Sequence, residues 1–252
     1  MTNNNKFLVL VPTYNEIGSI GKILDKLTSN NFRVLVIDDN SPDGTAEYVE
    51  NLRNPLIQVL IRPEKNGLGN AYKAGIRYAL VEISKFWNFD YLISMDADGS
   101  HQVSDLVQMT QLSEAKPDAL ILGSRWILGG GIKNWSKYRI KLSKAGTWYA
   151  KRALKMDTND LTGGFRIYPR KFIEKLDLDK IQSNGYSYQI EMAFALKQLG
   201  CKISECPITF VERETGVSKM SYKIVLEAIW KVTKLGLGLR LRPNADKLHY
   251  VK

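Results

Sequence analysis

The sequence predicts an α/β fold with a mostly parallel central sheet and helices on both faces. Short apolar runs alternate with helical patterns through the first half of the chain, which is typical of successive strand–helix–strand units. The runs contain almost no polar residues, as expected for strands that are buried on both faces. A chain of 252 residues with 44% hydrophobic residues is also long enough to bury one large core.

Five strands are expected before residue 125. They cover residues 7–11, 34–37, 57–61, 91–95 and 119–123. A helix follows the first strand, because apolar residues recur at helical spacing from Ile17 to Leu27. A short helix that Asp43 or Thr45 could cap follows the second strand. Another helix, with apolar positions up to Ile83, follows the glycine-containing loop at residues 65–70.

The second half of the chain has a different pattern. We expect the glycines at 129–131 to be flexible, and a basic, aromatic segment follows at 133–152. A tight turn at 161–164 leads into a strand, and a helix at 187–199 ends at Gly200. A further strand is expected at 203–211 and an amphipathic helix at 222–235. We therefore predict a catalytic domain at 1–221, followed by an amphipathic helix and basic tail at 222–252.

The composition limits the possible partners and compartment. A net charge of +10 favours phosphorylated substrates or an acidic membrane surface, and no DNA- or RNA-binding motif is present, so nucleic acid is not expected. Two cysteines, Cys201 and Cys206, are too few for a disulfide framework and suit a reducing, cytoplasmic compartment. We expect no signal peptide and no transmembrane helix.

Acidic residues follow three of the predicted strands. Glu16 follows the first, Asp38 and Asp39 the second, and Asp96 and Asp98 the fourth. Ligands in open α/β sheets bind beyond the carboxyl ends of the strands, and paired carboxylates suit Mg²⁺ or Mn²⁺ on a diphosphate. A single Asp-x-Asp is more often a solvated turn, but three acidic strand ends on one edge favour a polar ligand that carries a cation.

These motifs resemble the family 2 glycosyltransferases of the GT-A fold, on the segments 12–16, 38–45 and 96–98. Five further segments resemble polyprenol-phosphate (dolichol-phosphate) mannose synthases. They are residues 67–72, 123–125, 162–166, 185–192 and 217–221. The segments 12–16, 38–45 and 96–98 specify only the superfamily, whereas those at 185–192 and 217–221 are more specific. Together they span nearly the whole chain.

The resemblance implies a nucleotide-sugar site and a metal site. Around the nucleotide sugar it implies Pro12, Tyr14, Glu16, Asp38, Asp39, Gly69 and Asp96. Asp96 and Asp98 would hold the diphosphate and its Mg²⁺ or Mn²⁺, with Ser100 at the position of a third ligand. The resemblance also implies that the acceptor is a lipid monophosphate, which needs cations and hydroxyls. The implied contacts are Arg125, Arg139, Ser143, Arg213 and Lys219. Catalysis is assigned to Asp96, Asp98, Arg125, Arg139 and Arg213.

The expected activity is inverting transfer of mannose from GDP-mannose to a polyprenyl or dolichyl phosphate on a membrane. The enzyme would be peripheral on the cytoplasmic membrane face, in contact with anionic lipid and with a membrane-anchoring subunit as a possible partner. The alternatives are transfer of glucose or another hexose to the same lipid, or a non-catalytic scaffold subunit. A sugar-nucleotide pyrophosphorylase would need a glycine-rich phosphate loop after the first strand, and residues 12–16 do not form one.

Overall fold

The computed structural model describes residues 4–185, 187–212, 222–241 and 249–252, with backbone alone at 222–225 and 239–241. Its strands are β1 (Phe7–Thr13), β2 (Arg33–Asp38), β3 (Ile57–Ile61), β4 (Tyr91–Ser94), β5 (Ala119–Ser124), β6 (Gly131–Lys133), β7 (Arg166–Pro169), β8 (Lys202–Pro207) and β9 (Thr209–Val211). Its α-helices are α1 (Ile20–Ser29), α2 (Thr45–Asn51), α3 (Leu68–Val81), α4 (Val103–Ala115), α5 (Lys137–Leu154), α6 (Arg170–Ile173), α7 (Ser187–Gln198) and α8 (Tyr222–Leu241). Short 3₁₀ turns are at Asn4–Lys6, Ile83–Lys85 and Leu178–Lys180.

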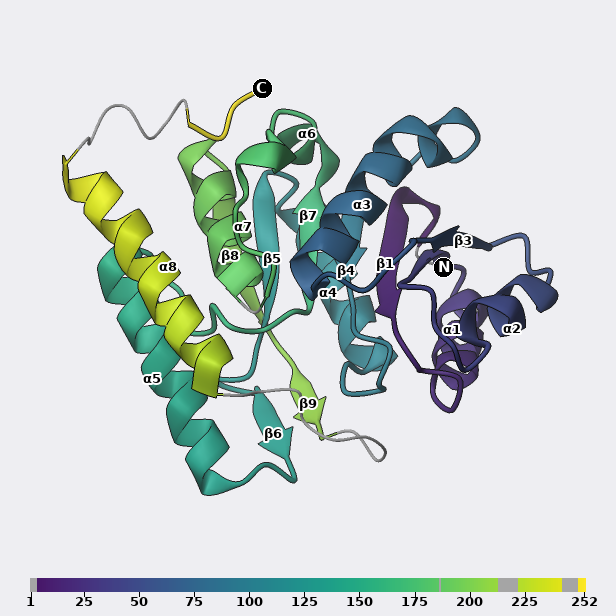
Figure 1. Ribbon diagram of the computed structural model, residues 1–252, viewed down its shortest axis with the longest axis horizontal. Helices are drawn as coiled ribbons and strands as arrows, with labels where there is room; N and C mark the ends of the chain where they lie inside the picture. The colour runs from purple at the N-terminus through teal and green to yellow at the C-terminus, as the bar shows by residue number, and fades with distance from the viewer. Residues whose placement is uncertain (1–3, 186, 213–221, 242–248) are drawn as a thin grey trace.

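The central sheet has seven strands in the order β3-β2-β1-β4-β7-β5-β8 (Figure 1). β7 runs antiparallel to its neighbours β4 and β5, and the other pairs are parallel. The carboxyl ends of β1, β2, β4 and β5 therefore lie along one edge, where ligands of such sheets bind. The α/β class and the mostly parallel sheet are confirmed.

Side-chain alternation along the strands divides the core between the two faces of the sheet. Leu8 and Leu10 point to one face, where α3, α7, α5 and α8 contribute to a shared cluster. Val9 and Val11 point to the other, which is packed against α1, α2 and α4. The strands are apolar throughout because each face needs its own buried side chains.

The prediction of one strand at 203–211 is wrong, because this segment forms two strands in different sheets. β8 ends at Pro207, which has no amide hydrogen to donate to a ladder. β9 then pairs in parallel with β6 in a separate two-stranded sheet. This small sheet lies beside the start of α5 (Figure 1).

The glycines at 129–131 connect β5 to β6, and their expected flexibility stays a prediction. Gly131 begins β6, and its amide donates to Ile208 O at 2.9 Å. A Cβ at Gly130 would lie 2.5 Å from Ser124 O, so the backbone approach there excludes any side chain. Gly130 therefore permits close packing next to β5.

The last residues of the chain are docked on the main body. Tyr250 is buried in the core cluster, and its backbone oxygen accepts a hydrogen bond of 2.8 Å from Asp177 N. Helix α8 extends beyond the predicted end at 235 to Leu241 and packs beside α5 and α7 (Figure 1). The division into 1–221 and 222–252 stays a prediction. Within the described residues, we find no helix with the length and apolar content needed to cross a bilayer.

Candidate active site

A cavity of about 530 Å³ lies beyond the carboxyl ends of β4 and β5 and continues between α5 and α8. Five of the predicted site residues line it together. They are Asp96, Asp98, Arg125, Arg139 and Ser143. The first three lie in the loops after β4 and β5, and the last two are on α5. The fold therefore brings together residues that are up to 47 positions apart in the sequence. Arg213 and Lys219 lie outside the described residues.

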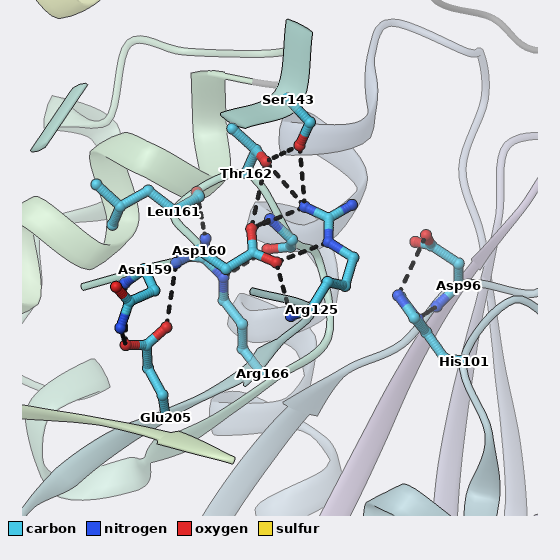
Figure 2. Close-up of polar contacts among 11 residues, drawn as sticks. Asp96, His101, Arg125, Ser143, Asn159, Asp160, Leu161, Thr162, Arg166 and Glu205 are labelled. Atoms are coloured by element: carbon cyan, nitrogen blue, oxygen red, sulfur yellow. Dashed lines mark hydrogen bonds and ion pairs between the residues drawn. The ribbon is translucent and has the colours of Figure 1, made fainter. Parts of the chain in front are cut away.

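The loop after β4 is held by His101. The Asp96 amide donates to His101 Nδ1 at 3.0 Å, and His101 Nε2 lies 3.8 Å from Asp96 Oδ2 (Figure 2). The tautomer that fits this network therefore carries its proton on Nε2. The imidazole stacks on the Phe165 ring at 4.6 Å between centroids. His101 thus orients the loop that presents the two carboxylates.

The structure offers a partial ligand set for a divalent cation. The described residues contain no cluster of three or more acidic, histidine or cysteine side chains that could form a complete metal site. Two carboxylates, Asp96 and Asp98, line the cavity, and Asp98 Oδ1 accepts a hydrogen bond of 3.0 Å from Ser100 N. The Ser100 hydroxyl is buried without a hydrogen-bond partner among the described residues. Such a set fits Mg²⁺ or Mn²⁺, which substrate phosphates and water complete.

Arg125 is held rigidly by a buried carboxylate that the sequence analysis did not identify. Its Nε and Nη2 donate to the two oxygens of Asp160, at 2.6 and 2.7 Å (Figure 2). Nη2 also donates to Thr162 Oγ1 at 2.9 Å and lies 3.5 Å from Ser143 Oγ. Its Nη1 has no hydrogen bond to the part of the chain that the structure describes. The guanidinium therefore keeps one donor nitrogen for a ligand.

Asp160 is fixed in turn by β8. Glu205 Oε1 accepts from Asp160 N at 3.1 Å, and its Oε2 accepts from the backbone and side-chain nitrogens of Asn159 (Figure 2). The Asp160 side chain is fully buried, so its charge depends on Arg125 for compensation. Glu205 therefore holds the loop at 159–160, and Asp160 of this loop holds Arg125.

Arg139 is held more loosely, at the rim of the cavity. Its Nη1 donates to Glu212 Oε1 at 2.7 Å, and its guanidinium lies 3.9 Å from the centroid of the Trp135 ring. Its Nε is buried without a hydrogen-bond partner among the described residues. A buried donor that lacks a partner is costly, so it marks a place for an acceptor from a ligand.

The predicted nucleotide-site acids Asp38 and Asp39 are both buried and engaged. Asp38 accepts from Thr13 Oγ1 at 2.8 Å and from Ser41 N and Oγ at 2.7 and 2.6 Å. Asp39 forms an ion pair with Arg62. Burial raises the pKa of Asp39 above its ordinary value, although the Arg62 guanidinium opposes this effect. These contacts brace the loop after β2, and direct contact with a nucleotide stays a prediction.

Apart from Asp96, the other predicted nucleotide-site residues also lie outside the cavity lining. Pro12 is in β1, and the Lys65 ammonium lies 3.8 Å from the centroid of the Tyr14 ring. Glu16 accepts from Ser19 Oγ at 3.1 Å. The Gly69 amide donates to Asn184 O at 2.8 Å, so that group is already used. Their nucleotide contacts remain predictions.

The outer half of the cavity is apolar. Its walls come from Leu142, Ala145, Gly146, Trp148 and Tyr149 of α5, from Ala228, Ile229 and Val232 of α8, and from Leu68 and Ile190. Trp148 and Ile229 are exposed as well, so the apolar half opens at the surface of the molecule. One cavity therefore joins a charged end with an apolar end.

Comparison with known proteins assigns this chain to a family. The profile described as glycosyl transferase family 2 matches residues 8–177. The chain belongs to glycosyl transferase family 2. The resemblance deduced from the motifs is confirmed.

Two curated relatives match this glycosyltransferase over most of its length. Undecaprenyl-phosphate mannosyltransferase of Micrococcus luteus is 42% identical over 241 residues, which cover 93% of this chain and 96% of that protein. Polyprenol monophosphomannose synthase of Mycolicibacterium smegmatis is 38% identical over 239 residues, which cover 93% and 88%.

Solved structures match the fold of this glycosyltransferase at low sequence identity. Glucosyl-3-phosphoglycerate synthase of Mycobacterium tuberculosis, solved with Mn²⁺, UDP and glucosyl-3-phosphoglycerate, superposes with a TM-score of 0.63 at 16% identity. The match covers 93% of this chain and 79% of that one. The GT-A fold is confirmed.

Several residues of the glycosyltransferase site gave no signal on their own in the sequence. Asp160 and Glu212 hold the two arginines, and Phe210 and Trp135 lie next to each other with ring centroids 5.2 Å apart. Thr162, which accepts from Arg125 Nη2, belongs to the segment 162–166, whose sequence indicates no role for its hydroxyl. The pairing of β6 with β9 brings Trp135 and Phe210 together, and no periodicity in the sequence indicates such a pairing.

Proposed function

We propose that the protein transfers mannose from GDP-mannose to a polyprenyl or dolichyl phosphate, and releases GDP. The observation that carries the proposal is the single cavity with carboxylates and arginines at one end and apolar walls at the other. A lipid monophosphate has the same two parts, an anionic head and an apolar chain. The names of the two curated relatives, an undecaprenyl-phosphate mannosyltransferase and a polyprenol monophosphomannose synthase, support the same acceptor class and the same sugar.

The acceptor phosphate is proposed to bind at the arginine end. Arg139 Nε is a buried donor without a partner among the described residues. The hydrogen bonds of the Arg125 guanidinium to the described residues use Nε and Nη2, which leaves Nη1 as a second donor. The Ser143 hydroxyl lies beside Arg125, 3.1 Å from Thr162 Oγ1, and adds one more donor, whereas the Thr162 hydroxyl donates to Asp160 Oδ1 at 3.3 Å. Hydrogen bonds from arginine to phosphate are charge-assisted, and they are about twice as strong as neutral ones.

The isoprenoid chain is proposed to lie between α5 and α8. The chain next to the phosphate is apolar, and placing it against Leu142, Ile229 and Val232 removes apolar surface from water. The opening at Trp148 and Ile229 lets the rest of a long chain leave the protein. A pocket closed at that end would suit only a short acceptor.

Asp96 and Asp98 are proposed to hold a divalent cation, Mg²⁺ or Mn²⁺, together with the donor diphosphate. When bound, such an ion offsets the negative charge that develops on the leaving diphosphate. The proposal rests on the two carboxylates in the cavity, because a likeness at 16% identity extends only to the fold.

The reaction is proposed to need no protein base. A phosphate monoester has a second pKa of about 6, so near neutral pH its oxygen is already deprotonated. That oxygen forms a bond to the anomeric carbon as the bond from this carbon to the diphosphate breaks, and the electron pair leaves with GDP. Attack opposite the diphosphate inverts the anomeric carbon and gives a β-linked product. Arg125 and Arg139 position the acceptor.

The face formed by α5 and α8 is proposed to contact an anionic membrane surface. It exposes Tyr138 and Trp148 on α5 and Leu226, Trp230 and Leu237 on α8. Lysines at 137, 141 and 144 on α5 and at 234 on α8 are exposed as well. An apolar surface with surrounding cations is typical of helices that bind at a lipid interface. The acceptor would then reach the cavity without leaving the membrane.

The test of the proposal is a donor panel. Purified protein receives GDP-mannose, GDP-fucose, UDP-glucose or UDP-GlcNAc with a short polyprenyl phosphate, and label in the lipid is measured. We expect label from GDP-mannose. If label came from UDP-glucose alone, the transferred sugar would be glucose and not mannose. If no donor labelled the lipid, the proposal would be contradicted.

A further inference from the structure

Gln189 is a buried polar side chain on the cavity wall that the proposed mechanism does not use. It is on α7, lines the cavity and is only 3% exposed. Its Oε1 accepts a hydrogen bond of 3.0 Å from the Tyr168 hydroxyl. Its Nε2 is buried and has no partner among the described residues. A buried amide nitrogen without an acceptor is destabilising, which favours a ligand as its missing partner.

The space next to this nitrogen is kept open by Gly164. The atoms nearest to a Cβ at Gly164 would be Gln189 Nε2, at 3.6 Å, and the two Asp96 carboxylate oxygens, at 3.7 and 3.9 Å. The Gln189 amide and the Asp96 carboxylate therefore lie on two sides of the space that a side chain at position 164 would occupy. A hydroxyl group matches this pair, because its oxygen accepts from the amide while its hydrogen is donated to the carboxylate.

The wall around Gly164 is held in place by several hydrogen bonds. Ser94 Oγ donates to Gly164 O at 2.5 Å. The fully buried Arg166 donates to the backbone oxygens of Gly163, at 2.8 Å, and of Gln189. These contacts fix the amide relative to Asp96, so the site is preorganised rather than formed by side chains that are free to turn.

We propose that the space at Gly164 receives one hydroxyl group of the donor hexose, which Gln189 Nε2 and Asp96 hydrogen-bond from two sides. Gln189 is then a residue that determines sugar specificity. The proposal deepens the proposed function and rests on it for the assumption that the donor is a hexosyl nucleotide.

The test measures donor binding by calorimetry without lipid, in the presence of Mg²⁺. The ligands are GDP, GDP-mannose and its 2-, 3-, 4- and 6-deoxy analogues. Gln189→Met keeps the length of the side chain and removes the amide. Gly164→Ala fills the space with a methyl group that meets no atom closer than 3.6 Å, so the fold should tolerate it. Gln198→Met, at the end of the same helix and outside the cavity lining, is the matched control.

We expect the wild type and Gln198→Met to bind one deoxy analogue about 10- to 100-fold more weakly than GDP-mannose. Gln189→Met and Gly164→Ala should bind GDP-mannose and that analogue almost equally, with the affinity for GDP unchanged. The inference would be overturned by wild-type discrimination in both variants, or by a wild type that binds GDP-mannose no more tightly than GDP. A wild type with the expected binding pattern that forms no lipid product would contradict the proposed function alone.

Discussion

The two arginines of the cavity are held in different ways. Arg125 follows a central strand and is buried, and its guanidinium forms two hydrogen bonds to the fully buried Asp160. Arg139 is on α5, at the rim, and its partner Glu212 has a side chain that is 34% exposed. The first pair is part of the fold as well as of the site, whereas the second can change partners. The cavity thus combines a rigid inner contact with an adaptable outer one, and the predictions below test this difference.

The largest effect is expected at the inner end from Asp98→Asn. The substitution removes a charge that would hold the cation and diphosphate, so kcat should fall about 10²- to 10³-fold, as for the loss of one preorganised electrostatic contact. Thermal unfolding should change little, and EDTA should inactivate the wild type. Asp25→Asn, at an exposed position on α1, is the control. Full activity in chelator would contradict the metal proposal.

Replacing each arginine with alanine should separate the effect on activity from the effect on stability. Arg125→Ala and Arg139→Ala should both lower kcat/KM about 10²-fold or more. Only Arg125→Ala should also lower the free energy of unfolding, by about 3–5 kcal/mol, because it leaves the buried Asp160 carboxylate without its partner. Urea unfolding measures this. The double variant Arg125→Ala/Asp160→Ala should regain stability but not activity. Equal stability losses in the two single variants would show that the arginines do not differ.

The pH profile should follow the acceptor rather than a protein base. Because the second phosphate pKa is about 6, kcat/KM for the lipid phosphate should rise about 10-fold from pH 5 to pH 7 and stay flat to about pH 8. Steady-state rates over this range check the prediction. A carboxylate variant that binds donor and metal normally, and that an added small base reactivates, would contradict it.

Membrane binding at the outer end of the cavity should depend on the exposed apolar residues of α8. Leu226→Ser/Trp230→Ser should weaken binding to anionic vesicles about 5- to 10-fold, since both side chains are more than 60% exposed on α8 and add apolar contact with lipid. Phe86→Ser, at a similarly exposed aromatic residue elsewhere, should leave vesicle binding unchanged. Removing residues 222–252 is a poorer test, because Val232 and Tyr250 belong to the core. Unchanged sedimentation of the double variant with vesicles would refute the membrane contact.

The smallest effect is expected from Glu212→Gln. In the proposed site, the Glu212 carboxylate would compete with the acceptor phosphate for Arg139, and a partly exposed ion pair of this kind is worth up to about 1 kcal/mol. The KM for polyprenyl phosphate should therefore fall up to about 5-fold, while the KM for the nucleotide sugar stays constant. A higher KM for the lipid phosphate would indicate that Glu212 supports the acceptor instead.

The inner half of the site was more predictable than the outer half. Asp96, Asp98 and Arg125 lie in the loops that follow apolar strands, and the carboxyl ends of parallel strands meet at one edge of the sheet. Asp160 and Glu212 could not be found in this way, because they lie 35 and 73 residues from the arginines that they bind. Helix α5 was not predicted either, since few of its side chains are buried, among them Thr147, Ala150 and Leu154.

The end of α8 shows how packing overrides a local pattern. Gly236 and Gly238 disfavour helix, and the prediction ended the helix at 235. The structure continues it to Leu241, and Gly236 packs against Ala153, whose backbone oxygen would lie 2.8 Å from an added Cβ. The glycine therefore permits close contact between α8 and α5, which depends on tertiary structure.

The central claim, that one cavity joins a phosphate site to a lipid site, is tested most directly by comparing two acceptors. Purified protein, labelled GDP-mannose and Mg²⁺ are incubated with a polyprenyl phosphate or with the polyprenol that lacks the phosphate, and the label in lipid is measured. We expect β-linked mannose on the polyprenyl phosphate and about 10²-fold less, or none, on the polyprenol, because the alcohol cannot use the arginines. Equal labelling of both lipids, or an α-linked product, would contradict the account.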